Sequence, residues 1–322
     1  MAFKVFIDGE AGTTGLKIHA RLRERRDLEV ISIAPALRKD SSARADALNR
    51  ADAVILCLPD GAAREAVSLI TNDKVRVIDA STAHRVAHGW AYGFPEMDRD
   101  QSKAIARSTR VSNPGCFATG AIALLRPIVK AGLLPREFPV TINAVSGYTG
   151  GGRALIAEFE QTAPADARDA FRAYDLPLTH KHLPEIQAFS GLTHPPILAP
   201  SVGRYAQGML LEIPLHLWAL AGAVTPADLR DALAAAYAGF HFVEVAPKSE
   251  SDALQQTRKN PNGYVGGVDP ESLNGTNHMK LFVFGNEERR QARLVAVLDN
   301  LGKGASGAAV QNMRLMLGLA ED

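Results

Sequence analysis

The first twenty-two residues constrain the fold most, because they join an apolar segment to a glycine-rich loop and a helix. Residues 3–7 are almost wholly apolar, as in a buried strand, and residues 16–22 have the spacing of an amphipathic helix. The loop between them reads G-x-x-G-x-x-G, a variant of the common G-x-G-x-x-G. Strand, glycine loop and helix in this order form a phosphate cradle. The residues expected to hold a dinucleotide here are Gly9, Gly12, Thr13, Thr14 and Gly15.

Apolar and helical segments continue to alternate along the first third of the chain. We expect strands at residues 28–34, 53–58 and 75–78, and a helix at residues 62–70. Such alternation is typical of a parallel sheet with helices on both faces, which binds ligands at the carboxyl ends of its strands. The sequence therefore predicts an α/β, Rossmann-type domain at the N-terminus.

The end of the second expected strand favours NADP over NAD. Folds that bind NAD place an acid there, which accepts a hydrogen bond from the ribose 2′-hydroxyl. Here Arg38 and Lys39 follow the strand, and no acid occurs before Asp40. Two cations suit a 2′-phosphate, although cations at this place can also be solvated loop charges.

Beyond residue 140 the pattern changes to that of an α+β domain. We expect strands at residues 140–145, 208–215, 240–246 and 279–285, and helices at residues 226–238 and 290–300. This pattern predicts a mixed, largely antiparallel sheet. We expect a catalytic, substrate-binding domain of residues 116–299. The NADP-binding domain would comprise residues 1–115 and be completed by a C-terminal helix within residues 300–322.

Cys116 is the candidate nucleophile. It follows the turn Asn113-Pro114-Gly115 and precedes a helical apolar pattern over residues 121–129. A thiol at a helix N-terminus loses its proton more readily, because the helix dipole and the unpaired N–H groups favour the thiolate. The alternative is a small, half-buried thiol after a turn. Cys57 lies inside an apolar strand, and we expect it to be part of the core.

His180 and His182 form a second chemical cluster, with Glu185 close behind in the sequence. Two histidines separated by one residue point the same way on an extended segment. A metal site with Glu185 and His194 is disfavoured because no tight set of ligands accompanies them, so no metal is expected. A structural pair and an acid/base role both remain, and a nucleophilic cysteine favours the second. We favour His182 over His180 as the acid/base.

These stretches together resemble one enzyme family. Residues 113–120, the glycine loop 146–153, the His-x-His-x-Pro-Glu-Ile element at 180–186 and the Asp-x-Ser-x-x-x-Arg element at 79–85 are similar to the signatures of N-acetyl-gamma-glutamyl-phosphate reductases, shorter subtype. That family belongs to the aspartate-semialdehyde-dehydrogenase group. The resemblance implies NADPH-dependent reduction of N-acetyl-gamma-glutamyl phosphate through a cysteine thioester, in arginine biosynthesis. Reduction of an aminoadipyl or aspartyl phosphate, or a non-catalytic NADP-binding sensor, remain as alternatives.

These elements, together with Asn300 and Arg204 outside them, provide further candidate site residues. Those expected to contact the cofactor are Ser81 and Asn300, and those expected to contact the substrate are Arg85, Asn113, Arg153, Glu185 and Arg204. Arg85 follows the strand expected at residues 75–78, and ligands bind at the carboxyl ends of such strands, so Arg85 is placed to meet an anion. Glu185 could orient an imidazole ring.

Bulk composition excludes several classes of function. A net charge of +1 over 322 residues gives no reason to expect a nucleic acid or membrane partner. Two cysteines do not make a disulfide framework, and no apolar run reaches the roughly 18 residues of a membrane span. We expect a cytoplasmic enzyme without a signal peptide. We also expect a homo-oligomer, either dimer or tetramer, that acts on a small molecule and phosphate.

Overall fold

The computed structural model describes residues 2–23, 25–161, 170–255, 258–260 and 263–320. The chain divides into two compact units, the first made of residues 1–115 and 304–322 and the second of residues 116–303. None of the described helices has both the length and the apolar character needed to cross a membrane.

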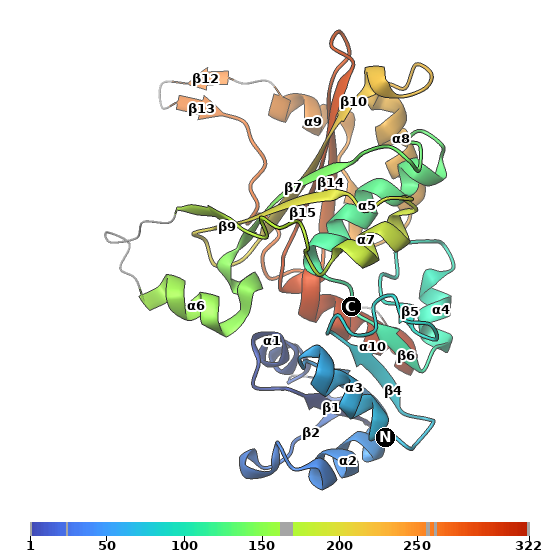
Figure 1. Cartoon of the computed structure of the whole chain (residues 1–322), viewed down its shortest axis with the longest axis vertical. Coiled ribbons are helices and arrows are strands. Elements are labelled where there is room, and N and C mark those ends of the chain that lie inside the picture. The colour runs from blue at the N-terminus through green and yellow to red at the C-terminus, as the bar shows by residue number, and fades with distance from the viewer. Residues whose placement is uncertain (1, 24, 162–169, 256–257, 261–262, 321–322) are drawn as a thin grey trace. The chain divides into compact units, whose positions relative to one another are not determined.

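The first unit contains a six-stranded, wholly parallel sheet with strand order β2-β1-β3-β4-β6-β5 (Figure 1). Its strands are β1 (Phe3–Asp8), β2 (Leu28–Ile31), β3 (Ala53–Leu56), β4 (Arg76–Asp79), β5 (Ala91–Tyr92) and β6 (Arg110–Ser112). Its helices are α1 (Thr13–Leu22), α2 (Ser41–Arg50), α3 (Asp60–Ser68), α4 (Gln101–Arg107) and α10 (Gly307–Leu317). This confirms the Rossmann-type prediction.

The core of this unit consists of two apolar layers. One layer joins Val5 and Ile7 of β1 to side chains of α1 and α10. The other joins Phe6 of the same strand to side chains of α2 and α3. Because neighbouring residues of β1 point into different layers, both faces of the sheet are covered. Strand β3 is consequently an unbroken apolar run, as parallel central strands usually are.

The second unit is built on a seven-stranded mixed sheet with strand order β11-β14-β15-β10-β7-β9-β8. Its strands are β7 (Thr141–Gly147), β8 (Phe171–Ala173), β9 (Ile197–Gly203), β10 (Met209–His216), β11 (Val243–Val245), β14 (Met279–Asn286) and β15 (Gln291–Leu298). Its helices are α5 (Cys116–Lys130), α6 (Gly152–Gln161), α7 (Leu183–Ser190), α8 (Pro226–Tyr237) and α9 (Lys248–Gln255). A separate ladder pairs β12 (Arg258–Asn260) with β13 (Gly263–Val265). Most pairs in the large sheet are antiparallel, as predicted.

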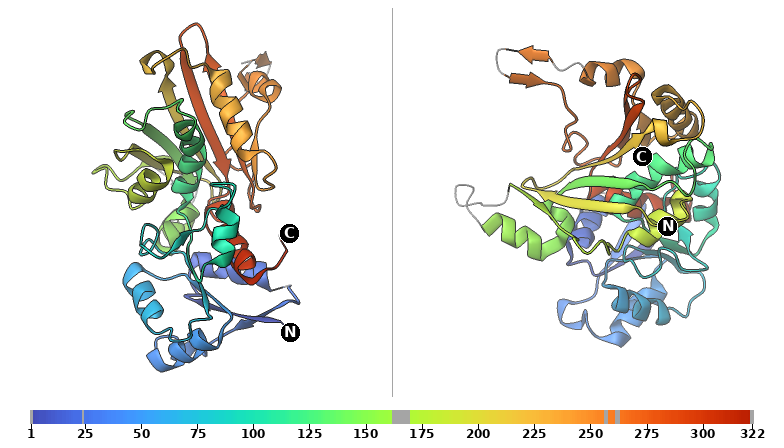
Figure 2. Two further views of the ribbon diagram at one scale, coloured as in Figure 1. Left: turned by 90° about the vertical axis from the view of Figure 1, so that its right-hand side faces the viewer. Right: turned by 45° about the horizontal axis from the view of Figure 1, so that its top comes forward.

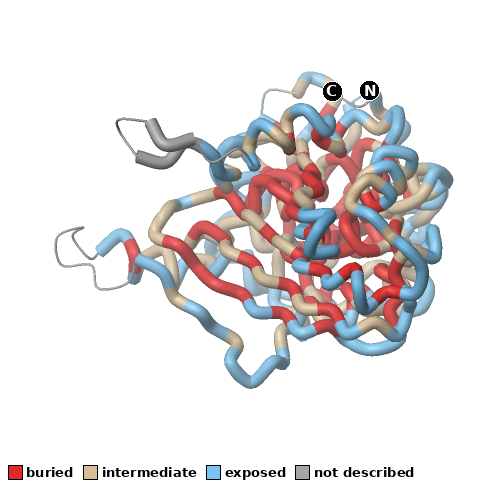
Figure 3. The backbone as a smooth tube through the Cα atoms, turned by 90° about the horizontal axis from the view of Figure 1, so that it is seen from above, coloured by how far each residue is buried: buried red, intermediate tan, exposed pale blue. Residues whose placement is uncertain are grey.

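One face of this sheet carries helices. Helix α5 packs on β10 and β15, α8 packs on β14 and β11, and α7 packs on α5 (Figure 1). Gly120 of α5 faces these strands, because a Cβ built there would lie 3.4 Å from Ala296 and 3.7 Å from Leu211. The tube coloured by burial shows the buried residues running along the strands (Figure 3).

The opposite face is covered only in part. The register brings Ala199, Asn143, Glu212, Val295 and Phe282 into one row across five neighbouring strands. Val295 and Phe282 lie in a buried apolar cluster, whereas Ala199 is exposed. The end of the row on β9 and β7 is thus accessible in the isolated chain.

The helix expected at residues 290–300 is wrong. Residues 291–298 form β15, which pairs antiparallel with β10 on one side and with β14 on the other (Figure 2). A short apolar run has similar periodicity in a helix and in a buried strand, and here pairing on both sides selects the strand. Strands β2 and β11 are also shorter than expected, ending at Ile31 and beginning at Val243.

Candidate active site

Cys116 is the first residue of α5, as the sequence predicts. The first turn of this helix contains no acidic side chain that would disfavour a thiolate. Ten residues of α5 are buried, so the helix is a rigid element rather than a surface segment. This position gives Cys116 the electrostatic setting of a nucleophilic thiol.

Phe117 packs against both histidines of the His180–His182 pair. Its ring centroid lies 5.5 Å from that of His180 and 5.9 Å from that of His182. The two imidazoles are 4.5 Å apart, and the His182 backbone N–H donates to His180 Nδ1 at 3.2 Å. His182 is 4 % exposed and forms the N-cap of α7, which packs on α5. Both histidines are therefore held beside the first turn of α5.

Tyr174 joins this cluster, although sequence reasoning missed it. Its ring lies 6.1 Å from that of His180, and its backbone N–H donates to Pro200 O at 3.1 Å. Burial, and then the charge of the neighbouring Cys116, raise the pKa of Tyr174 above its ordinary value. The phenol consequently remains protonated at neutral pH and can donate a hydrogen bond. Tyr174 belongs to no motif, so only the folded chain reveals it.

Three other predicted residues of the second unit are held by contacts within the protein. Arg204 donates from Nη1 to Phe159 O at 3.1 Å and lies 4.8 Å above the ring of the same residue. Asn300 accepts from the Gly208 N–H at 2.8 Å and donates to Thr149 Oγ1 at 3.1 Å. Glu185 is 1 % exposed in the first turn of α7.

Arg153 lies at the start of α6 and is exposed. Within the described part of the chain, no three His, Cys, Asp or Glu side chains gather as a metal-binding group.

In the first unit, the glycine loop has the geometry of a phosphate cradle. Gly9 has φ of 89°, and a Cβ there would lie 2.3 Å from Cys57 O. A Cβ on Gly15 would lie 2.6 Å from Gly9 O. The N-cap of α1 is Gly12, and no side chain caps that helix, so the first N–H groups of α1 lack a side-chain acceptor. The loop therefore fits a dinucleotide pyrophosphate, and Thr13 and Thr14 begin the helix that would hold it.

A pocket of about 450 Å³ lies beside this loop. Arg38 and Lys39 line it, as does Arg44 of α2. Arg44 donates to Asp8 Oδ2 from Nη2 at 2.9 Å and from Nε at 3.2 Å. Sequence reasoning did not find the buried Arg44–Asp8 pair, because its members are far apart in the chain.

Asp79, at the carboxyl end of β4, organises a third group of residues. This fully buried carboxylate accepts from the Ser81 N–H at 2.8 Å and from Ser81 Oγ at 2.7 Å. His84 Nδ1 lies 2.6 Å from its Oδ2. Arg85 is 8 % exposed and donates from Nε to Asn113 O at 3.1 Å. Ser81, Arg85 and Asn113 thus meet at one edge of the parallel sheet.

The side chain of Asn113 is held from both ends. Its Nδ2 donates to Ala305 O at 3.0 Å, and its Oδ1 accepts from Asn312 Nδ2 at 3.1 Å. The backbone N–H donates to Asp79 O at 2.7 Å. These bonds fix the turn that follows β6.

The two cysteines have different surroundings. Burial, followed by the charges of Asp79 and Asp8, raises the pKa of Cys57 to about 12. Its thiol is therefore protonated and unreactive at neutral pH, in agreement with the expected core role.

Comparison with known proteins gives consistent matches along the chain. Residues 116–300 match the family described as semialdehyde dehydrogenase, dimerisation domain, and residues 36–105 match semialdehyde dehydrogenase, NAD binding domain. The N-acetyl-gamma-glutamyl-phosphate reductase of Mesorhizobium japonicum is 55% identical over 318 residues, covering 98% of this chain and 99% of that protein. A reductase of the same name, numbered 2, from Nostoc sp. is 51% identical over 99% of this chain and 98% of its own length.

Solved structures share the fold at lower identity. Aspartate semialdehyde dehydrogenase II from Vibrio cholerae aligns with a TM-score of 0.69 at 15% identity, covering 99% of both chains. The Candida albicans aspartate semialdehyde dehydrogenase, solved with NADP, aligns with a TM-score of 0.63 at 13% identity over 98% of this chain and 99% of that one.

Proposed function

Because the chain belongs to the N-acetyl-gamma-glutamyl-phosphate reductases, within the semialdehyde dehydrogenases, we propose that it reduces N-acetyl-gamma-glutamyl phosphate to N-acetylglutamate semialdehyde with NADPH. This reaction belongs to arginine biosynthesis. The observation that carries the proposal is the position of Cys116 at the start of α5, with His180 and His182 packed around the adjacent Phe117. We assign this thiol-dependent chemistry to a reducing cytoplasm, because a working thiol suits such a compartment and both cysteines are free.

In this mechanism Cys116 is the nucleophile. Its thiolate forms a bond to the acyl carbon while the bond from that carbon to the phosphate oxygen breaks, which leaves a thioester and inorganic phosphate. NADPH, held by the glycine loop and the pocket beside it, would supply the hydride that reduces this carbon. The bond from carbon to Cys116 then breaks, its electron pair returns to sulfur as the thiolate, and the aldehyde leaves. The reaction takes up one proton overall, which ends on the released phosphate, and His182 is the group that we assign to supply it. Tyr174, protonated beside Cys116, is a donor for the oxyanion.

The remaining predicted residues differ in burial. Arg153 is exposed and suits the substrate carboxylate. Arg85, Asn113 and Arg204 are less exposed and contact protein groups, so we assign them to holding the substrate-binding loops as well as the substrate itself. The assigned cofactor contacts are Gly9, Gly12, Thr13, Thr14, Gly15, Arg38, Lys39, Ser81 and Asn300. Glu185 is assigned to orienting an imidazole.

The test is NADP reduction in the reverse direction, started with N-acetylglutamate semialdehyde and inorganic phosphate. The rate should depend on phosphate, and aldehydes that would yield aspartyl or aminoadipyl phosphate should react more slowly. Cys116→Ser should abolish the rate while cofactor binding persists, because a serine hydroxyl without a strong base is a poor nucleophile. A serine variant that keeps more than about a tenth of the rate would exclude thioester catalysis.

The two cations of the pocket have their own test. Replacing both Arg38 and Lys39 by Ala should weaken the binding of NADPH by roughly ten- to a hundredfold, since charge-assisted contacts to a 2′-phosphate are lost. The binding of NADH should weaken much less. Equal weakening of both cofactors would remove these residues from the cofactor site.

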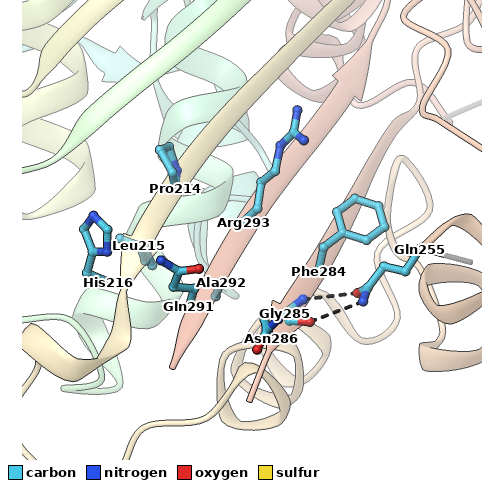
Figure 4. Close-up of a pocket in the computed structure, with 10 residues that line it drawn as sticks. All are labelled: Pro214, Leu215, His216, Gln255, Phe284, Gly285, Asn286, Gln291, Ala292 and Arg293. Atoms are coloured by element: carbon cyan, nitrogen blue, oxygen red, sulfur yellow. Dashed lines mark hydrogen bonds between the residues drawn. The ribbon is translucent and has the colours of Figure 1, made fainter. Parts of the chain in front are cut away.

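We further propose that the accessible face of the large sheet pairs with a second copy of the chain. The family domain that covers this sheet is a dimerisation domain. On this face Pro214 pairs with Arg293 in the register, and a hollow of about 490 Å³ lies next to them (Figure 4). Arg293 forms an ion pair with Glu212, which offers a polar centre on this face. A twofold axis would place this same patch opposite itself.

Matched variants test this assembly. Ala199→Arg puts a charge on the accessible sheet face, whereas Ala234→Arg puts the same charge at an exposed position of α8. Sedimentation of the whole chain should show a smaller particle for Ala199→Arg only. An unchanged particle for both variants would place the interface elsewhere, and dimer and tetramer are read from the wild-type mass.

A further inference from the structure

Six charged side chains line the pocket beside the glycine loop, and their formal charges cancel. The cations are Arg38, Lys39 and Arg44, and the acids are Asp8, Glu10 and Glu65. A pocket without net charge attracts a dianionic phosphate weakly unless one of its internal ion pairs opens. How these pairs are arranged therefore decides how the pocket receives an anion.

Arg44 cannot be the cation that is released. It forms its ion pair with Asp8 at 2.9 Å, and the two side chains are only 9 % and 7 % exposed. Its second pair, with Glu65, measures 3.5 Å. Opening a pair this buried is costly, because each charge would lose its partner without regaining full hydration. Arg44 thus belongs to the wall of the pocket.

Arg38, in contrast, forms an accessible pair with Glu10. Arg38 Nη2 lies 2.5 Å from Glu10 Oε1, and the side chains are 43 % and 18 % exposed. Ion pairs this close to solvent exchange partners at small cost. Glu10 lies in the glycine loop, whose backbone is tightly packed, since a Cβ on Gly15 would lie 2.7 Å from Glu10 Cα. The loop therefore fixes the backbone of Glu10, and the carboxylate of this residue meets Arg38.

Glu10 also takes the place of the acid that the sequence lacks after β2. The first acid there, Asp40, caps α2, and its Oδ1 accepts from the Ala43 N–H at 2.8 Å. Glu10 of the glycine loop supplies the carboxylate in this corner instead, because it pairs with Arg38, which follows β2. An acid in this corner of a dinucleotide-binding fold favours a ribose hydroxyl over a phosphate.

We propose that Glu10 sets the discrimination between NADP and NAD by competing with the 2′-phosphate for Arg38. The inference rests on the cofactor pocket proposed above. To take a 2′-phosphate, Arg38 must first leave Glu10. Towards a 2′-hydroxyl, Glu10 keeps Arg38 and accepts a hydrogen bond. Removing the negative charge of Glu10 therefore favours the phosphorylated cofactor.

The test measures binding alone, by calorimetric titration of the whole chain. The probes are NADP⁺ and NAD⁺, together with adenosine 2′,5′-bisphosphate and 5′-AMP, which differ by the 2′-phosphate. Glu10→Gln should tighten both 2′-phosphorylated probes by about three- to fivefold, the upper end of what releasing a solvent-accessible ion pair contributes. NAD⁺ and 5′-AMP should bind unchanged or more weakly. Glu29→Gln, at an exposed position of β2, is the matched control and should change nothing.

A double variant separates competition from simple repulsion. On an Arg38→Ala background, Glu10→Gln should tighten the 2′-phosphorylated probes by less than about twofold, because Arg38 is no longer there to be released. An equal effect on both kinds of probe, weaker binding of NADP⁺ by Glu10→Gln, or full tightening without Arg38 would each overturn the inference. If the wild-type chain bound none of the four probes, the proposed cofactor site would fail as well. Normal wild-type binding with no effect of Glu10→Gln would refute the competition alone.

Discussion

The two cysteines should differ by orders of magnitude in their reaction with iodoacetamide. The attacking species is the thiolate, so the labelling rate of a thiol follows its ionised fraction. Cys57 lies within the first unit, where burial and the nearby Asp79 and Asp8 raise its pKa to about 12. Cys116, in contrast, begins a helix, a position that stabilises a thiolate.

The size of the effect at Cys57 follows from its pKa. At pH 7.5 a thiol of pKa about 12 is ionised to about 3 × 10⁻⁵, whereas an ordinary cysteine of pKa about 8.5 is ionised to about 0.1. Cys57 should therefore be alkylated about three thousand times more slowly than free cysteine. Its rate should rise about tenfold per pH unit through the alkaline range.

The assay is mass spectrometry of peptides after timed alkylation of the folded protein. Cys57 is followed in Cys116→Ser, so that modification of one thiol does not affect the other, and the denatured protein gives the reference rate. Cys116 of the wild type should react faster than free cysteine. Labelling of Cys57 within about tenfold of its denatured rate would show that its thiol is not shielded, and equal rates at both cysteines would favour a non-catalytic protein.

Three further outcomes follow from the structure. The pKa of Cys57 is raised, so as pH rises from about 9 towards about 12 the unfolded chain loses this proton before the folded chain does. In that range the free energy of unfolding of the wild type should fall with pH by about 1.4 kcal/mol per pH unit more than that of Cys57→Ala. Parallel pH profiles of the two proteins would contradict this. Arg44→Ala should lower the free energy of unfolding in urea by about 3–5 kcal/mol, because it leaves Asp8 buried without its partner. Arg44→Met combined with Asp8→Asn should recover most of that stability. A loss below about 1 kcal/mol for Arg44→Ala would show that the pair is hydrated. His182→Asn should lower kcat by roughly 10²–10⁴-fold with KM kept, and His180→Asn should give a milder, mixed change; the reverse pattern would move the acid/base role to His180.

The parts of the fold that were predictable are those in which local sequence and final contacts agree. Residues 3–22 specify strand, loop and helix through their own pattern, and the structure forms β1, the loop and α1 there. The turn before Cys116 likewise ends one element and begins the next within a few residues. In such segments the chain needs no distant partner to choose its conformation.

Strand β15 shows where this kind of reasoning fails. Its eight residues include several good helix formers, and their apolar run suits either structure. What decides is pairing with β10 and β14, and neither partner can be read from residues 291–298 themselves. The same limit applies to Tyr174, which reaches the Cys116 cluster only through the pairing of β8 and the loop that follows it.

The C-terminal helix α10 is held by the segment of residues 92–96, to which sequence analysis assigned no role. Asn312 of α10 donates to Gly93 O at 2.8 Å, and a Cβ on Gly93 would lie 2.4 Å from the same Nδ2, so only glycine leaves room for this bond. The neighbouring Gln311 donates to the buried Glu96 at 2.9 Å. Because Asn312 also donates to Asn113, one buried side chain joins the 92–96 segment, the turn after β6 and α10. The 92–96 segment is therefore a docking site for the end of the chain, and that helix holds the turn in place.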